Sequence, residues 1–459
     1  MSSGEQFPLL ESQQTLWEFV RFYAPADPGR ARMNLVETAV LPPGTATGTL
    51  RAALCDVAAR HESLRMLFTG LGDDPVLRLE PATEPGWTLH DLRELPPAER
   101  GPAYRAILRR AKHRDFDLLS GPLWTADAVL LPGDATILVV TVYHLVGDGA
   151  SMRVLLADLA VALLARRGLR PAPEQPPVTY RQVIAGQRAR WRANAERTAR
   201  WADSLLPLAD QLPFPVRESA PSAPARGGTK RPFRFPAAAM QELARGCRTT
   251  PYVVAMAAWA ATVMSAAGWD RLVMGGTSAG RNLPGGRHLV GQFTANWYLE
   301  IRDRPRGSFA ELVAAVDAGL REALRAAAPF QHVARLVHPG FDRERPWPFV
   351  HLFHAWFQDE PPTRRTPASD VLSVFPELRT GTPEERAPAA PPAVPRTLTH
   401  IRRHAPGITI GADRAGGLLD YEPAFFDDAV VGDLLDRYAR LIGVVLRDPG
   451  VTMRSGAWR

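Results

Sequence analysis

The 459-residue sequence is poor in cysteine and in lysine, and each shortage narrows the function classes open to it. Its two cysteines, Cys55 and Cys247, lie far apart without ligand spacing, which argues against a disulfide framework and favours a reducing compartment. Lys112 and Lys230 are the only lysines, and the arginines are scattered among acidic residues. The net charge of +7 therefore forms no basic stripe, and we expect no nucleic-acid partner.

The sequence also lacks the signals of export and of membrane insertion. Residues 1–14 have neither the basic start nor the apolar core of a signal peptide. Residues 252–269 are long and apolar enough for a membrane span, but they follow the capping pair Thr250-Pro251 and end near Gly268. We therefore expect a buried helix here, no membrane partner and a cytoplasmic protein.

Cofactor and metal motifs are missing as well. The sequence has no phosphate-binding loop, no G-x-G-x-x-G and no H-E-x-x-H, and its histidines show no ligand spacing. Residues 276–280, GTSAG, match the G-x-S-x-G pattern of hydrolases, but a loop follows Ser278 where a nucleophile elbow needs a helix. We therefore expect no metal and no tightly bound cofactor, and interpret the small residues as a close backbone approach.

The length indicates two domains, and the helix and strand pattern restarts after a linker over 213–232 that is rich in proline, serine and glycine. We predict an α/β half over residues 1–180, a connecting helix and linker over 181–232, and a second α/β half over 233–459. The periodicity predicts these elements: helices over 9–22, 47–60, 97–113, 151–167, 181–204, 236–247, 251–267 and 428–446, and strands over 31–40, 60–68, 125–131, 135–144, 271–278, 349–357 and 398–413.

The stretch VYHLVGDGAS, residues 142–151, places a histidine and an aspartate where a strand turns into a helix. A histidine at a strand end is often a packed, hydrogen-bonded side chain with no chemical role. Gly147 and Gly149, however, permit a tight turn, which would aim His144 beyond the sheet edge, where it is suited to move a proton.

Asp148 has more than one reading. It can orient the ring of His144, it can hold an arginine and brace the turn, or it can cap the helix that follows, as Ser151 also can. Asp148 lies four residues after His144 along a tight turn, and this separation favours the role in which it holds an arginine and braces the turn.

H-x-x-x-D-G at such a corner, in a chain of two α/β halves, resembles the condensation-domain family of nonribosomal peptide synthetases, which belongs to the chloramphenicol acetyltransferase-like superfamily. The resemblance covers nearly the whole chain. Further segments similar to the family's motifs are Ser12–Trp17, Arg60–Phe68, Phe116–Leu123, Thr249–Tyr252, Gly275–Arg281, Val290–Phe293 and Pro329-Phe330.

The resemblance implies two acetyltransferase-like subdomains in a V-shaped pseudo-dimer with a central tunnel. It implies an enzyme that joins an acyl or aminoacyl thioester, held on the phosphopantetheine arm of a carrier protein, to a small amine or alcohol. His144 would deprotonate or position the nucleophile, and the backbone N–H of Gly149 would approach the thioester oxyanion.

By the same resemblance, Asp148 would be structural and paired with an arginine. Arg281 is the first choice for this partner, with Arg60 and Arg65 as alternatives.

The sequence departs from the family pattern in three respects. Tyr143 replaces the first histidine of the pair, and because strand neighbours face opposite ways, we expect it to point away from the tunnel. Ala295 stands where the family has asparagine, so Asn296, Ser278 and Tyr143 remain candidates for the acceptor side. No adenylation, carrier or thioesterase region is present, so we expect a free-standing enzyme of specialised metabolism with its carrier in trans.

Two alternatives stay open. A catalytically inactive condensation-like domain would recruit a partner enzyme to a carrier protein, and Tyr143 favours this reading. An acyltransferase that uses coenzyme A thioesters is the other alternative, although the D-F-G-W-G segment of the plant-type enzymes is missing.

Overall fold

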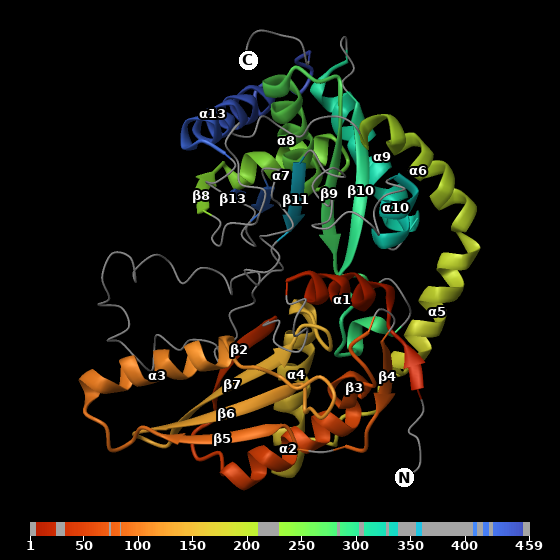
Figure 1. The fold of residues 1–459 in the computed structure, drawn as a ribbon. Helices are drawn as coiled ribbons and strands as arrows, with labels where there is room; N and C mark the ends of the chain where they lie inside the picture. Colours follow the sequence, from red (N-terminus) through yellow and green to blue (C-terminus); the bar gives the residue numbers. More distant parts are fainter. Residues whose placement is uncertain are drawn as a thin grey trace. The chain divides into compact units, whose positions relative to one another are not determined.

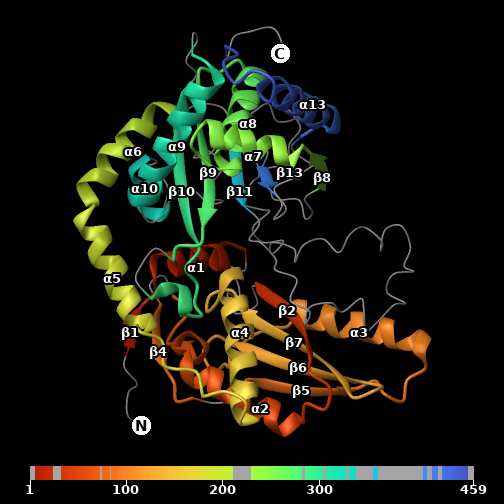
Figure 2. The same ribbon diagram turned by 180° about the vertical axis from the view of Figure 1, so that it is seen from behind.

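Helices and strands gather into two units, and Figures 1 and 2 show them from opposite sides. The computed structural model describes residues 6–23, 33–72, 75–82, 84–209, 229–281, 285–302, 307–326, 330–337, 355–359, 407–410, 416–421 and 426–452. The described residues of the first unit lie within Met1–Ala189 and Ala279–Thr294. Those of the second unit lie within Arg190–Ser278, Ala295–Thr363 and Arg396–Arg459.

The first unit contains a three-stranded sheet in the order β1-β4-β3 and a four-stranded sheet in the order β2-β7-β6-β5. Its strands are β1 (Gln6–Pro8), β2 (Asn34–Leu41), β3 (Met66–Phe68), β4 (Val76–Leu79), β5 (Gly86–Asp91), β6 (Trp124–Leu131) and β7 (Ala135–Tyr143). Its helices are α1 (Glu11–Tyr23), α2 (Thr47–Arg60), α3 (Pro97–Lys112), α4 (Gly149–Arg166) and most of α5 (Tyr180–Ala193).

The central strands β6 and β7 form an antiparallel hairpin that is buried on both faces. Because side chains alternate along a strand, Ile137 and Val139 share a core with Tyr104 and Ile107 of α3. Val142 faces the other side, where it lies close to Gly147 at the approach to α4. The hairpin therefore ends at a fixed place between two helical layers, and the turn that carries His144 begins there.

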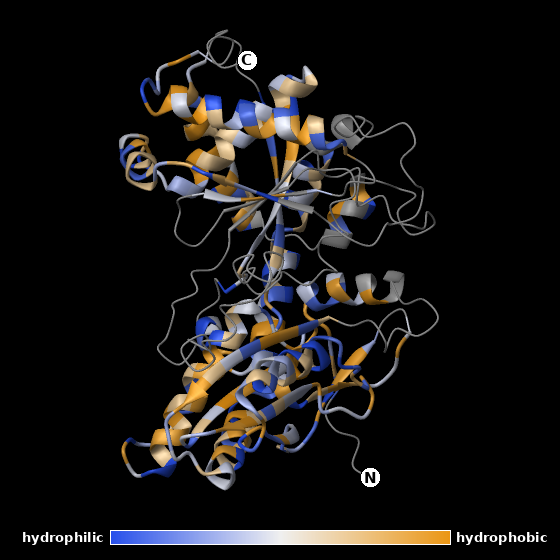
Figure 3. Cartoon of the chain, turned by 90° about the vertical axis from the view of Figure 1, so that its left-hand side faces the viewer, coloured by the Kyte–Doolittle hydropathy of each residue, from blue (hydrophilic) through white to orange (hydrophobic). Residues whose placement is uncertain are grey.

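The second unit has one mixed six-stranded sheet in the order β10-β9-β11-β12-β13-β8. Its strands are β8 (Thr229–Arg234), β9 (Arg271–Ser278), β10 (Ala295–Arg302), β11 (Ala355–Asp359), β12 (Gly407–Ile410) and β13 (Gly416–Tyr421). Its helices are α6 (Ala195–Ala209), α7 (Ala237–Gly246), α8 (Pro251–Ala267), α9 (Phe309–Ala326), α10 (Phe330–Val337) and α13 (Asp428–Val445). In Figure 3, orange and blue stretches alternate along the helices, as expected where one face is buried.

The apolar segment around 252–269 is α8, which begins with Thr250 as N-cap and Pro251 in the first turn, as predicted. It lies within the core of the second unit, where its Trp259 packs edge-on against Tyr438 of α13. No single helix in the described part of the chain is long and apolar enough to cross a membrane; α7 and α8 pass that test only together, with a bend of 92° between them.

Two sequence predictions need correction. The last residues of the predicted linker over 213–232 are not linker but the start of β8. The strand can contain Pro232, which has no backbone N–H, because it lies at the edge of the sheet. The single helix predicted over 181–204 is two helices. Between them, Asn194 donates from Nδ2 to the Arg190 carbonyl at 2.9 Å, so the side chain competes with the helical ladder.

Other boundaries differ less. The strand predicted over 60–68 is a 3-10 turn, Glu62–Arg65, followed by the short β3. The strands predicted over 349–357 and 398–413 fall partly outside the described residues, and β11 and β12 are the described parts. Ala279–Thr294, which the predicted division assigns to the half over 233–459, groups with the first unit because it bonds to residues there.

Candidate functional site

The corner after β7 is a tight turn that holds His144 in a single orientation. The backbone N–H of His144 donates to the Met33 carbonyl at 2.7 Å, and that of Val146 donates to the Tyr143 carbonyl at 2.9 Å. The ring nitrogen Nδ1 lies 2.9 Å from the carbonyl oxygen of Gly147. A side chain at Gly147 would collide with Val142 Cγ1, at 2.9 Å from the added Cβ, so the turn requires glycine.

This contact determines which nitrogen of His144 is basic. A carbonyl oxygen only accepts hydrogen bonds, so Nδ1 carries the proton and Nε2 keeps the lone pair. Burial lowers the pKa of His144 below its ordinary value, against the smaller opposing effects of backbone hydrogen bonds and the nearby Asp148 carboxylate. The ring is therefore neutral near pH 7, which is the state that can accept a proton.

Asp148 caps the helix that follows. Its Oδ1 accepts from the Ser151 N–H at 2.7 Å, while Ser151 Oγ accepts from the Asp148 N–H at 3.2 Å, which completes a reciprocal capping box. Its Oδ2 accepts from the Phe293 N–H at 3.0 Å. Asp148 is 1% exposed, so its charge is neutralised inside the protein and not by water.

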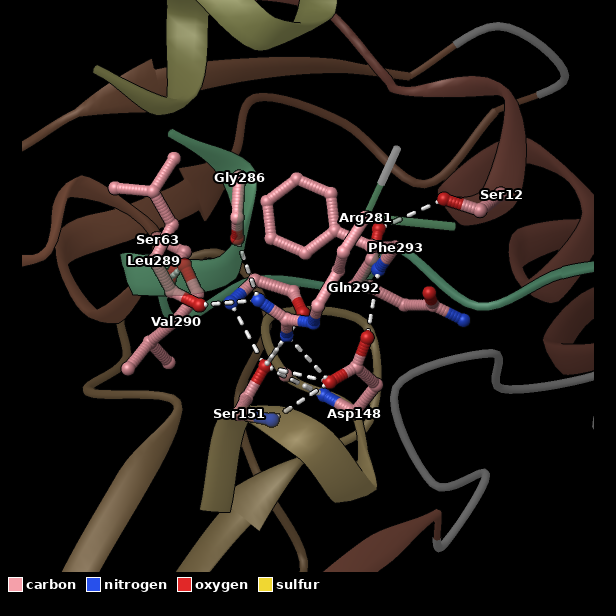
Figure 4. A network of polar contacts seen from close by, with 12 residues as sticks. Ser12, Ser63, Asp148, Ser151, Arg281, Gly286, Leu289, Val290, Gln292 and Phe293 are labelled. Atoms are coloured by element: carbon pink, nitrogen blue, oxygen red, sulfur yellow. Dashed lines mark hydrogen bonds and ion pairs between the residues drawn. The ribbon is translucent and has the colours of Figure 1, made fainter. Parts of the chain in front are cut away.

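Arg281 supplies the opposite charge (Figure 4). Its Nη2 donates to Asp148 Oδ1 at 2.7 Å and to Ser151 Oγ at 2.8 Å, and its Nη1 donates to the carbonyls of Gly286 and Leu289. Its guanidinium also lies 4.5 Å from the centre of the Phe293 ring. One arginine therefore joins the start of α4 to the segment 285–293.

Side chains from three further places fix the same segment. Ser12 donates to the Gln292 carbonyl at 2.7 Å, and Ser63 donates to the Val290 carbonyl at 2.7 Å. The Val290 N–H donates to Nδ1 of His61, whose Nε2 is 2.8 Å from Asp158. These bonds hold the segment 285–293 in place next to Asp148.

The structure separates the arginines considered as partners of Asp148. Arg281 contacts it, whereas Arg60 donates to Asp158 at 2.7 Å and Arg65 donates to the Glu80 carbonyl at 2.7 Å. Arg60 therefore contacts α4 and Arg65 contacts the residue after β4, and neither is hydrogen-bonded to Asp148 in the described structure.

The other sequence candidates lie in different surroundings. Tyr143 is buried, and its ring packs 5.8 Å from that of Phe116, just beyond α3. Gly149 is exposed as the first residue of α4, with open space where a side chain would be. Ser278 and Asn296 belong to the second unit, where Ser278 ends β9 and Asn296 is the second residue of β10. The Oγ of Ser278 is 3.5 Å from the Ala295 carbonyl.

Sequence reasoning missed several members of this network. Ser151 was considered as a cap but not as the hydroxyl that meets Arg281, and the spacing D-x-x-S was the available signal. Gln13, in the motif Ser12–Trp17, donates to the Leu145 carbonyl at 2.7 Å, and nothing in its spacing pointed to that distant partner. In the described part of the chain, no cluster of histidine, cysteine, aspartate or glutamate could hold a metal ion.

We expect Gly291→Ala to destabilise the protein by about 1–3 kcal/mol, because overpacking a filled interior has a cost of this size. The added Cβ would overlap Tyr180 Cε2 and lie 2.8 Å from Phe293 Cε2. Gly186→Ala is the matched control, since Gly186 lies inside α5 with open space around it, and there alanine should stabilise by about 0.5–1 kcal/mol. Equal melting temperatures for the two variants would contradict this packing argument.

Known proteins are similar to nearly the whole length of this chain. The family model of the condensation domain matches residues 5–353. The chain is similar to phosphinothricin tripeptide synthetase PhsC of Streptomyces viridochromogenes, with 28% identity over 450 residues, which is 96% of this chain and 39% of the synthetase. The chain thus spans well under half the length of that relative.

Two solved structures share the fold. The X-domain from teicoplanin biosynthesis has a TM-score of 0.72 and 22% identity, covering 99% of this chain and 98% of the other, and it has also been solved in complex with OxyB. The first condensation domain of the calcium-dependent antibiotic synthetase, in complex with a substrate analogue, has a TM-score of 0.68 and 18% identity, covering 98% of each chain. The chain belongs to the condensation-domain family of nonribosomal peptide synthetases, with the mixed α/β, chloramphenicol acetyltransferase-like fold of that family.

Proposed function

We propose that this protein is an active condensation enzyme, an acyltransferase that forms an amide or ester bond. The donor is an acyl or aminoacyl thioester on the phosphopantetheine arm of a carrier protein, and the acceptor is a small amine or alcohol. The product belongs to specialised metabolism of the nonribosomal-peptide kind. Membership of the condensation family supports the reaction class.

The observation that carries the proposal is the state of His144. Its Nδ1–H is bound to the Gly147 carbonyl, its pKa is lowered by burial, and its Nε2 keeps a lone pair. A neutral histidine held in one tautomer is in the state that a general base requires. Asp148 and Arg281 brace the same corner without being needed as proton carriers.

The chemistry follows from that state. The nucleophile's N–H or O–H gives its proton to Nε2 of His144 as the nitrogen or oxygen attacks the thioester carbonyl. The carbon–sulfur bond then breaks, and the phosphopantetheine thiolate takes the proton from His144, so that atoms and charge balance. The N–H of Gly149, at the positive end of α4, is our candidate for stabilising the oxyanion.

A second candidate function is recruitment of a partner enzyme to a carrier protein without catalysis. Tyr143, which replaces the first histidine of the family's pair, favours it. The X-domain, which has the same fold, is known in complex with OxyB. A coenzyme A-dependent acyltransferase is the third candidate, and the donor used would identify it.

Intact mass spectrometry of the carrier protein tests these functions. Carrier proteins loaded with different acyl groups are mixed with the protein and with a panel of amines and alcohols, and acyl-coenzyme A donors are tried in parallel. Acceptor-dependent loss of the acyl mass from the carrier supports condensation. Tight carrier binding with no mass change, identical in His144→Ala, would instead establish recruitment, and turnover of coenzyme A thioesters alone would establish the third function.

A further inference from the structure

The first turn of α1 reaches the turn that carries His144. Gln13 is completely buried, and its Nε2 donates to the carbonyl of Leu145 at 2.7 Å. Leu145 directly follows His144 in the chain but is 132 residues from Gln13. A polar side chain with no exposure keeps such a bond because losing it would leave a buried carbonyl and a buried amide without partners.

The contact of the amide oxygen of Gln13 determines which way the amide group is turned. Its Oε1 accepts from the Leu10 N–H at 2.9 Å, and Gln13 is the third residue of α1. This is the backward bond of a capping box, in which a glutamine at this position satisfies a free N–H at the helix start. Because the Leu10 N–H must meet an oxygen, the NH₂ group faces Leu145, and the assignment does not depend on an arbitrary amide flip.

The carbonyl of Leu145 lies between the two contacts that orient the ring. On one side, the His144 N–H is held by the Met33 carbonyl. On the other side, the Gly147 carbonyl accepts from Nδ1 and so selects the tautomer. If the peptide bond after Leu145 tilted, the backbone from Leu145 to Gly147 would change direction, and the carbonyl oxygen of Gly147 would move relative to the ring of His144. The hydrogen bond from Gln13 to the Leu145 carbonyl opposes this tilt.

From this geometry we infer that Gln13 is a positioning residue for His144, which through Leu145 holds the turn that sets the ring's orientation and tautomer. Its effect on rate rests on the proposed function, whereas its effect on the ring does not. Ser12, one residue earlier, donates to the Gln292 carbonyl instead. The start of α1 therefore holds both the turn before Asp148 and the segment 285–293 that Asp148 contacts.

Gln13→Glu removes the donor to Leu145. Glutamate keeps the size of the side chain and still accepts from the Leu10 N–H, but its carboxylate cannot donate to Leu145. We expect kcat at pH 8 to fall about 10- to 100-fold, the scale of a small misplacement of a catalytic group, with KM for the loaded carrier within about twofold. Burial raises the pKa of such a carboxyl, and its protonated form can donate again, so the kcat ratio to the parent should rise as the pH is lowered.

Gln182→Glu is the control for the change in the helix cap, at an exposed position. Gln182 is the third residue of α5, and its Oε1 accepts from the Thr179 N–H at 2.8 Å, so the same cap receives the same change. It contacts no residue of the His144 turn among the bonds of the described structure. Its kcat should match the parent at every pH.

The tautomer of the His144 ring is measured from ¹⁵N NMR spectra of histidine-labelled protein. The signal that is missing in His144→Ala identifies His144. A changed tautomer pattern in Gln13→Glu supports the inference whether or not the parent transfers acyl groups. A folded Gln13→Glu with unchanged kcat and an unchanged His144 signal overturns it. If Gln13→Glu does not fold, Gln13→Met, which is neutral and similar in shape, is measured in the same way. A parent that transfers nothing defeats the proposed function, and the spectra alone then decide the inference.

Discussion

His144→Ala is expected to lower kcat for acyl transfer by about 10²- to 10⁴-fold, the range in which a positioned acid or base contributes to rate. The ring is 5% exposed, and its Nδ1–H bond to Gly147 leaves Nε2 as the base, so alanine removes the proton acceptor. The Asp148–Arg281 pair remains, and we therefore expect the folded structure to persist. Carrier mass followed over time gives the rate, and circular dichroism reports folding.

His113→Ala is the control for this change, because His113 is an exposed histidine at the end of α3 in the same unit. It should leave kcat within about twofold of the parent, as for a surface substitution away from the chemistry. Undiminished turnover in a folded His144→Ala protein would remove His144 from the mechanism. A loss of similar size in both variants would show that the assay reports general damage.

The pH profile of kcat/KM separates a base from a residue that only positions the nucleophile. Burial lowers the pKa of His144 below its ordinary 6.5, so the neutral, basic form persists to a lower pH than in a free histidine. We expect the rate to be level near neutral pH and to fall as acid protonates His144, with the midpoint below 6.5. A profile with no such fall, in protein that stays folded, would favour positioning.

The corner at His144 was predictable because local rules fix it. A continuous run of apolar, largely β-branched residues indicates β7, two glycines permit the turn, and an aspartate three residues before a serine indicates the start of α4. The arginine partner of Asp148 came instead from the resemblance to the condensation family, with Arg281 as the first choice, and Arg281 contacts Asp148 in the structure. The prediction of the corner depended on neighbouring residues, and the prediction of the arginine depended on the family resemblance.

The rest of the network was not predictable, because its partners are far apart in sequence and bond through backbone groups. The Gln13 amide reaches the Leu145 carbonyl, and Ser63 reaches the carbonyl of Val290, 227 residues away. A carbonyl is present at every position, so the sequence does not mark the one that is used. The strand β8 was missed for a related reason, since Pro232 indicates a linker in the sequence, whereas a strand at the sheet edge can contain a proline.

Asp148→Asn should destabilise the protein by about 3–5 kcal/mol, because it leaves the buried guanidinium of Arg281 without a counter-charge. Arg281 is 9% exposed, so water cannot replace the lost carboxylate. Both carboxylate oxygens of Asp148 accept hydrogen bonds. In asparagine, one of these two positions is an NH₂ group, which can only donate. This group would then face the N–H of Phe293 or the donors of Ser151 and Arg281. We expect the melting temperature to fall by roughly 6 °C or more, using the scaling for a domain of 150–250 residues.

Asp56→Asn makes the same substitution in an arginine–aspartate pair with N···O distances of the same length but with far greater exposure. Arg166 donates to both oxygens of Asp56 at 2.7 Å, and the two side chains are 41% and 39% exposed. An exposed pair contributes about 0–1 kcal/mol, so this variant should melt within a few degrees of the parent. The double variant Asp148→Asn with Arg281→Met should recover part of the lost stability, because the stranded charge is gone. If Asp148→Asn instead melted like the parent while kcat collapsed, Asp148 would act on the chemistry and not on the architecture of the turn.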